Sequence, residues 1–115
     1  MRQAHTTTGI FVATMVLELM LLPAMVVADV GKNSCVGPIA CTENTGDVKN
    51  NSCDGDFACE HNTRAVGNGS CVGGFACTNN TGTIGNNSCN ADHACTNNTS
   101  PIGNNQCNTP HACEQ

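Results

Sequence analysis

Residues 69–86 read GSCVGGFACTNNTGTIGN, and residues 87–104 read NSCNADHACTNNTSPIGN. The two stretches share SC, ACTNNT and IGN at equivalent positions. The cysteines of the whole chain keep this register, because the gaps between them alternate strictly between six and twelve residues. The sequence is therefore a tandem repeat with an 18-residue period, which is typical of stacked repeat structures. Its ten cysteines are Cys35, Cys41, Cys53, Cys59, Cys71, Cys77, Cys89, Cys95, Cys107 and Cys113.

The first 28 residues differ from the rest in composition. An apolar stretch at 10–22 follows Arg2 and precedes the small-residue sequence Val26-Val27-Ala28. This order is typical of a cleavable secretory leader. The apolar stretch is shorter than the roughly 20 residues that a membrane-spanning helix needs, so an uncleaved anchor is the less favoured alternative. We predict a signal peptide at 1–28, a short lead-in at 29–32, and repeats at 33–50, 51–68, 69–86, 87–104 and, incomplete, 105–115.

The repeats hold too few large apolar residues for an ordinary core. Only ten large aliphatic or aromatic side chains occur after residue 28. Cross-links replace apolar burial in small secreted domains, and this chain has ten cysteines in an oxidising route. Gly, Asn and Thr recur in every unit and disfavour helix but suit tight corners. We therefore predict an all-β fold, a small disulfide-rich β-solenoid (β-helix) of about five coils. Its interior should hold the cysteines, the valines and isoleucines that recur every 18 residues, and Ile39, Phe57 and Phe75. The recurring residues are Val48, Val66, Ile84 and Ile102.

Two disulfide patterns are compatible with the repeat. Each unit can close on itself, as Cys71 with Cys77, or neighbouring coils can be linked along each cysteine column, because the spacing of stacked chains lies within disulfide reach. Each column holds five cysteines, an odd number, so the second pattern leaves one thiol unpaired per column. This count favours pairing within units, and the alternative stays open.

The repeat resembles a known kind of sequence. The motifs IGNNSC at 84–89 and ACTNNT at 94–99 resemble the Gly/Asn/Cys-rich tandem-repeat proteins predicted to be secreted in marine microalgae, diatoms especially. The resemblance covers residues 33–115 and implies secretion without an established activity. The Cys-x5-Cys unit with its threonine column is also similar, in part, to insect β-helical antifreeze proteins. Their ice face requires paired Thr-x-Thr rows, and only Thr81-Gly82-Thr83 forms one here.

Two sets of polar residues are candidate sites. The first is a threonine ladder that could meet an ordered surface such as ice, a glycan or a mineral. The alternative is that Asn-Thr pairs shape the corners of the coils. The second set consists of N-glycosylation sequons, which accept glycans in secreted proteins. The threonines are Thr45, Thr63, Thr81 and Thr99, and the sequon asparagines are Asn50, Asn68, Asn79, Asn86, Asn97 and Asn98.

Several function classes are disfavoured. We expect no enzyme and no cofactor, because the repeats lack a nucleophile elbow, a phosphate loop and a cysteine–base pair. We expect no metal site, since the Cys-x3-His-x-Cys pattern of His93 and His111 occurs in two units only and the sulfurs should be oxidised. The net charge of −5 with no Trp or Tyr argues against nucleic acid binding, and removal of the leader leaves no membrane segment.

The remaining class is a secreted, non-enzymatic structural or surface-interaction repeat protein. We expect it outside the cell or in the cell wall, in contact with an unknown extracellular partner, a glycan or a mineral surface. The alternative is an ice-binding or other ordered-surface-binding protein that uses the Asn/Thr ladder. Both readings depend on a surface that repeats one side chain at regular spacing.

Overall fold

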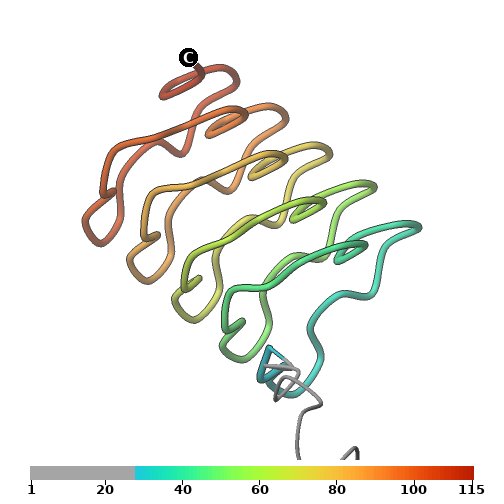
Figure 1. Ribbon diagram of the computed structural model, residues 1–115. Helices are drawn as coiled ribbons and strands as arrows, with labels where there is room; N and C mark the ends of the chain where they lie inside the picture. Colours follow the sequence, from blue (N-terminus) through green and yellow to red (C-terminus); the bar gives the residue numbers. More distant parts are fainter. Residues whose placement is uncertain (1–27) are drawn as a thin grey trace, which may run out of the picture.

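The computed structural model describes residues 28–115, so the predicted signal peptide at 1–28 lies outside them except for its last residue, Ala28. The described chain winds into a stack of coils (Figure 1). Each coil contains one disulfide-closed loop, and we number coils 1 to 5 by the cysteines at 35, 53, 71, 89 and 107. Residues 18 positions apart occupy the same place in successive coils, and we call such a set a column.

The predicted all-β β-solenoid is wrong. Residues 28–115 contain no helix and no strand, and hence no helix that could span a membrane. The only β pairing among them is a series of isolated parallel bridges, one per pair of coils, such as Val48 with Val66 and Val66 with Ile84. The molecule is instead a small disulfide-rich domain of irregular coils.

Left-handed backbone explains why strands do not form. In coil 3, positive φ angles occur at Gly69 (62°), Cys71 (58°), Phe75 (55°) and Asn79 (55°). The same four columns have positive φ in the other complete coils. An extended strand requires negative φ over several consecutive residues. A left-handed residue every few positions turns the chain before a strand can develop.

Backbone hydrogen bonds between neighbouring coils hold the stack together. Some amides donate forward to the next coil, as Cys53 N does to Ser70 O at 3.0 Å. Others donate back to the previous coil, as Cys59 N does to Ala40 O at 2.7 Å. These bonds satisfy backbone groups that would otherwise be buried without partners. The coils therefore stack in register although they form no sheet.

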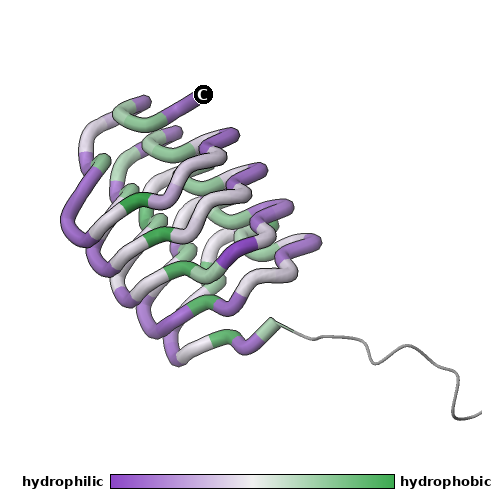
Figure 2. The backbone as a smooth tube through the Cα atoms, turned by 60° about the vertical axis from the view of Figure 1, so that its left-hand side comes forward, coloured by the Kyte–Doolittle hydropathy of each residue, from purple (hydrophilic) through white to green (hydrophobic). Residues whose placement is uncertain are grey.

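The interior contains the valine and isoleucine column. Val48, Val66 and Ile84 are 1%, 0% and 4% exposed, which confirms their predicted inward position. They pack in one cluster with the buried cysteines and the alanines that precede the second cysteine of each loop. Figure 2 shows hydrophobic residues recurring at the same place in successive coils. The apolar interior is thus a narrow line that runs along the stack.

The second part of the interior is polar. The side chains of Asn62, Asn80 and Asn98 are 0%, 0% and 1% exposed. Each donates from Nδ2 at 2.8 Å to the amide oxygen of the asparagine one coil earlier, and also to the carbonyl two residues later. Buried serines form a similar series, in which Ser52 Oγ accepts from Ser70 N. These hydrogen bonds compensate for the loss of water around the buried polar side chains.

The predicted inward position of Ile39, Phe57 and Phe75 is wrong. Ile39 is 47% exposed and Phe75 is 36% exposed, while Phe57 is half-buried. The prediction assumed the alternation of a strand, in which Phe57 would share a side with Cys59. The left-handed backbone at Phe57 removes that alternation. The side chains of this column therefore lie along an outer edge of the stack.

Candidate functional site

The predicted threonine ladder lies on the surface. Thr45, Thr63, Thr81 and Thr99 are all exposed. The amide of Thr63 donates to Asn80 O at 3.0 Å, and the amide of Thr81 donates to Asn98 O at 2.9 Å. Each of these threonines follows a member of the asparagine column that fills the polar interior. The buried asparagine ladder thus sets the position of the threonines and their spacing of one coil.

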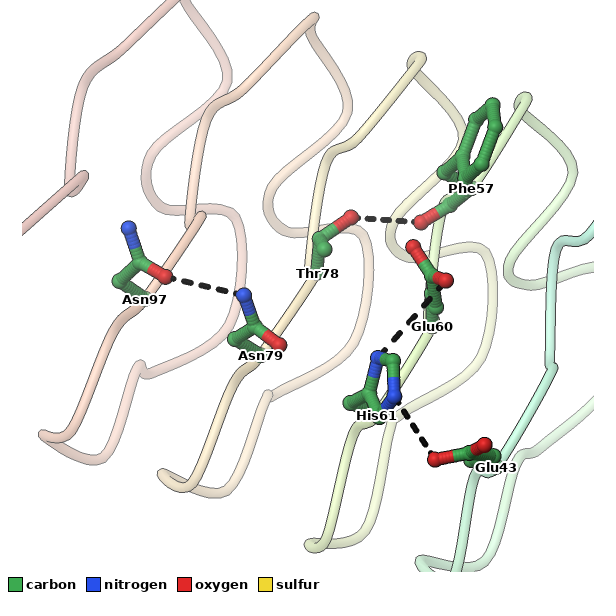
Figure 3. A network of polar contacts seen from close by, with 7 residues as sticks. All are labelled: Glu43, Phe57, Glu60, His61, Thr78, Asn79 and Asn97. Atoms are coloured by element: carbon green, nitrogen blue, oxygen red, sulfur yellow. Dashed lines mark hydrogen bonds and ion pairs between the residues drawn. The ribbon is translucent and has the colours of Figure 1, made fainter.

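The residues around the threonines divide the ladder into two halves. In coils 1 and 2 the position two residues before the threonine carries Glu43 and His61, whose Oε2 and Nε2 lie 2.8 Å apart (Figure 3). In coils 3 and 4 that position carries Asn79 and Asn97, and Asn79 Nδ2 donates to Asn97 Oδ1 at 3.2 Å. The ladder is charged in its first half and neutral in its second.

Flanking positions on the other side follow this division in part, because Asp47 and Arg64 are charged whereas Thr83 and Pro101 are neutral. The residues two positions after the threonines are exposed. The residue directly after each threonine is buried where it is a glycine, at Gly46 and Gly82. Coil 1 presents Asp47, whereas coil 3 presents Thr83. Among the described residues, threonine hydroxyls beside neutral amides therefore follow one another without a charge only over coils 3 and 4.

An edge of stacked rings is a feature that sequence analysis missed. Phe57, Phe75, His93 and His111 stack in order, with ring centroids 4.7, 4.9 and 5.2 Å apart and planes within 5° of parallel. The inner rings cover each other's faces, so they offer mainly edges to a partner. A shallow hollow beside the stack is lined by Asp56, Gly74, Phe75, Asp92 and His93. The 18-residue recurrence of ring-bearing residues was the signal that could have revealed the stack.

The polar contacts behind this edge help to fix it. Thr78 Oγ1 donates to Phe57 O at 2.6 Å (Figure 3), and Thr96 Oγ1 donates to Phe75 O at 2.6 Å. Glu60 Oε1 lies 3.8 Å from His61 Nδ1 on the neighbouring surface. Hydrogen bonds from the threonines thus hold the backbone of the ring-bearing residues against the next coil.

The ten cysteines pair within units, as the cysteine count favoured. The bonds are Cys35–Cys41, Cys53–Cys59, Cys71–Cys77, Cys89–Cys95 and Cys107–Cys113. No free cysteine occurs in the described chain. The sulfurs of Cys59, Cys71 and Cys77 lie within 4.8 Å of one another, because disulfides of neighbouring coils stack. Metal binding by cysteine requires thiolates, which these bonded sulfurs cannot supply.

The sequon asparagines differ in accessibility. Asn50, Asn68, Asn79, Asn86 and Asn97 are exposed, whereas Asn98 is buried. Asn98 Nδ2 donates to Asn80 Oδ1 and to Ser100 O. A glycan on that nitrogen would interrupt the interior ladder. Asn50, Asn68 and Asn86 use only Oδ1 to accept an amide of the previous coil, so Nδ2 of these residues faces no such conflict.

Comparison with known proteins identifies the family. A family model described as "Domain of unknown function (DUF7640)" matches residues 40–115. The chain belongs to this family. The match begins within the first disulfide loop and covers all later coils. No curated protein and no solved structure matches the chain.

The family assignment supports one part of the resemblance drawn from the sequence. That part is a cysteine-rich repeat with a regular disulfide pattern. The match comes with no named relative. It therefore does not test the likeness to microalgal proteins or to insect antifreeze proteins. The five disulfides themselves indicate an extracellular or secreted protein, because such bonds persist in oxidising compartments.

Proposed function

We propose that this chain is a secreted, non-enzymatic structural or surface-interaction repeat protein of the cell wall or extracellular matrix. The observation that carries the proposal is the in-register stacking of disulfide-closed coils, which places identical side chains in exposed columns. Thr63 and Thr81 are an example. A rigid column of this kind can contact a partner that is itself repetitive, such as a glycan or a mineral.

Binding to extracted wall or matrix material tests this function. We expect the purified protein to sediment with the material, and Thr81→Lys to weaken that binding at least severalfold. Thr81 is exposed, so the substitution alters the ladder without entering the interior. Val72→Lys is the matched control, because Val72 is 42% exposed but lies in the disulfide loop. Wild-type protein that binds neither wall, matrix, glycan nor mineral would refute the proposal.

Secretion includes removal of the leader before Asp29. The support for this step is the small-residue site that ends at Ala28, together with the disulfide-bonded state of the coils. A tagged copy should reach the wall, the matrix or the medium, and N-terminal sequencing of that material should begin at Asp29. Membrane-bound protein that retains Met1 would contradict both the processing and the location.

Glycosylation accompanies the secretory route in this proposal. Mass spectrometry of the secreted protein, before and after enzymatic removal of N-glycans, should locate glycans among the exposed sequons. Asn98 should be unmodified, because its side chain is buried in the asparagine ladder. Steric crowding between sequons one coil apart, as at Asn68 and Asn86, should keep occupancy partial. A glycan found mainly on Asn98 would contradict this assignment.

The alternative function is binding to ice or another ordered surface. One observation favours it: coils 3 and 4 present Thr81, Thr83 and Thr99 beside neutral amides rather than charges. Thermal hysteresis and ice-shaping assays decide between the two functions. A clear hysteresis with micromolar protein, lost in Thr81→Lys and kept in Val72→Lys, would replace the leading proposal.

A further inference from the structure

The two ends of the stack expose apolar groups that the middle buries. Val30, at the start of the valine column, is 47% exposed, whereas Val48 and Val66 in the same column are 1% and 0% exposed. Ile102, at the other end of the column, is half-buried. The disulfide cysteines behave in the same way, because those of coils 2 to 4 are 0% exposed and those of coils 1 and 5 are partly exposed.

The last coil also carries a row of carbonyl groups without partners. The carbonyls of Asn86, Asp92, Ala94 and Thr96 accept amides from residues of coil 5. The next members of these four columns lie at the C-terminal end of the stack, and no amide in the described chain donates to them. These acceptors are the carbonyl oxygens of Asn104, Pro110, Ala112 and Glu114.

The first coil carries the matching donors. In coil 2 the amides of Asn51, Phe57, Cys59 and His61 donate to carbonyls of the preceding coil. The coil 1 members of these columns have no such acceptor within residues 28–115. These donors are the amides of Asn33, Ile39, Cys41 and Glu43. Each lies one residue after the column of one of the four free carbonyls, which is the offset of the bonds between coils within the chain.

From this complementarity we infer that the protein associates head to tail, with coil 1 of a second copy stacked on coil 5 of the first. The second copy continues the 18-residue register across the junction. The four amides of its coil 1 then meet the four free carbonyls, and Cys107 N donates to Ser34 O of the second copy, as Cys89 N donates to Gln106 O within one chain. In this arrangement Val30 covers Ile102.

The continued register also sets the spacing between the two copies along the chain direction. Three positions of the register separate Gln115 of one copy from Asp29 of the next. The inference rests on the proposed removal of residues 1–28, because a retained leader would emerge from coil 1 at the docking edge. The contact joins two different surfaces by a rotation that does not close, so repeated association yields rods rather than a closed oligomer.

One side chain restrains this association. Gln106 occupies the serine column in coil 5, and its Oε1 accepts the amide of Gly103 at 3.0 Å. In the preceding coil the corresponding amide, Gly85 N, donates to the next coil at Ile102 O. Gln106 therefore caps one of the donors that a second copy would use. Terminal caps of this kind limit growth in repeat proteins.

The glycine column supplies a variant that blocks the edge. A Cβ on Gly85 would lie 2.5 Å from Gly103 C of the next coil, so a side chain at this column points toward the following coil. On Gly103 itself a Cβ would meet only the flexible end of Gln106, at 3.2 Å. Gly103→Val should therefore leave the single chain folded and obstruct a second copy. Thr83→Val adds a similar apolar side chain at an exposed position away from the ends and is the matched control.

Sedimentation velocity and electron microscopy of the secreted protein test the inference, with the N-terminus of each sample determined. We expect concentration-dependent rods for the wild type and for Thr83→Val, and a monomer for Gly103→Val. Gln106→Ser should lower the dissociation constant about fivefold to tenfold by uncapping Gly103 N. Monomeric wild-type protein that begins at Asp29, or rods that persist unchanged in Gly103→Val, would overturn it.

The N-terminus separates failure of this inference from failure of the proposed processing. If Met1 is retained, the processing proposal fails, and the inference then requires a monomer. Cleavage of that protein at a protease site engineered before Asp29 must produce rods. Rods formed with the leader still attached, or no rods after cleavage, would overturn the head-to-tail contact.

Discussion

Coils 3 and 5 contain the same two-cysteine loop but differ in burial. The Cys71–Cys77 bond lies between two neighbouring coils and both cysteines are 0% exposed, whereas Cys107 and Cys113 are partly exposed. The amide of Cys71 donates to Ser88 O, but the amide of Cys107 has no partner within the described chain. The difference shows that a unit has no core of its own. Its burial comes from the coils on either side.

Removal of single disulfides should give the largest difference between these two regions. Cys71→Ser with Cys77→Ser should destabilise the protein by about 2–5 kcal/mol, because it releases a loop at the centre of the stack. Cys107→Ser with Cys113→Ser should cost clearly less and should fray only coil 5. Urea titration measures the loss of stability of each variant, and amide hydrogen exchange of the folded protein locates the fraying. Equal losses at the two positions would show that the coils do not depend on their neighbours.

The buried asparagine ladder should give the next largest effect. Asn80 donates to Asn62 Oδ1 and to Gly82 O, and its Oδ1 accepts Asn98 Nδ2. Asn80→Ala should therefore cost about 3 kcal/mol, since it leaves buried partners unsatisfied. Asn44→Ala, in the half-buried first member of the column, should cost about 1 kcal/mol. Thermal denaturation compares the two, and a smaller loss for Asn80→Ala would contradict the ladder's role.

Substitution of Asp54 should raise the stability of the protein rather than lower it. Its Oδ1 is buried without a hydrogen-bond partner in the described structure. In the same column, Asn90 Nδ2 donates to Gly69 O at 2.8 Å, 21 residues earlier. Asp54→Asn should gain the equivalent bond to Asn33 O and stabilise the protein by about 1 kcal/mol. Asn90→Asp is the reciprocal variant and should destabilise it. Loss of stability in Asp54→Asn would refute this register argument.

The exposed ring edge should give the smallest effect. Phe75→Asn removes two ring contacts, each about 0.5–1.5 kcal/mol. It also replaces an aromatic residue at a φ of 55° by one that tolerates left-handed backbone, a relief of about 1–2 kcal/mol. The two terms largely cancel, so the net loss of stability should be at most about 2 kcal/mol. Val66→Asn, at a 0% exposed position, serves as the contrast and should unfold much of the stack in the same urea titration. A large loss for Phe75→Asn would assign the ring stack a structural role.

The sequence predicted the parts of the fold that depend on repetition. The 18-residue register and the burial of Val66 follow from equivalent residues occupying equivalent places, and the odd number of cysteines in each column favoured the pairing of Cys71 with Cys77. The exposed position of Thr81 follows in the same way. None of these inferences requires knowledge of the backbone angles within a coil.

The predictions of strands and of inward-facing phenylalanines were wrong for a common physical reason. Propensities assign left-handed backbone to glycine and asparagine, yet here Cys71 and Phe75 also adopt it. Stacking against equivalent residues stabilises these angles, and that contribution is invisible in a single unit. For the same reason the corner asparagines, such as Asn80, were not recognised as an interior hydrogen-bonded ladder. Side-chain amides there fill space that a β-sheet fold would fill with apolar residues.

Amide hydrogen exchange at the first cysteine of each loop tests the central claim most directly. Cys35, Cys53, Cys71 and Cys89 donate to a carbonyl of the next coil at 3.0 Å, and Cys107 does not. In dilute, monomeric protein the account predicts slow exchange at Cys53, Cys71 and Cys89 and fast exchange at Cys107, although all belong to the same motif. Uniform exchange at all of these amides would contradict the stacking of the units in register.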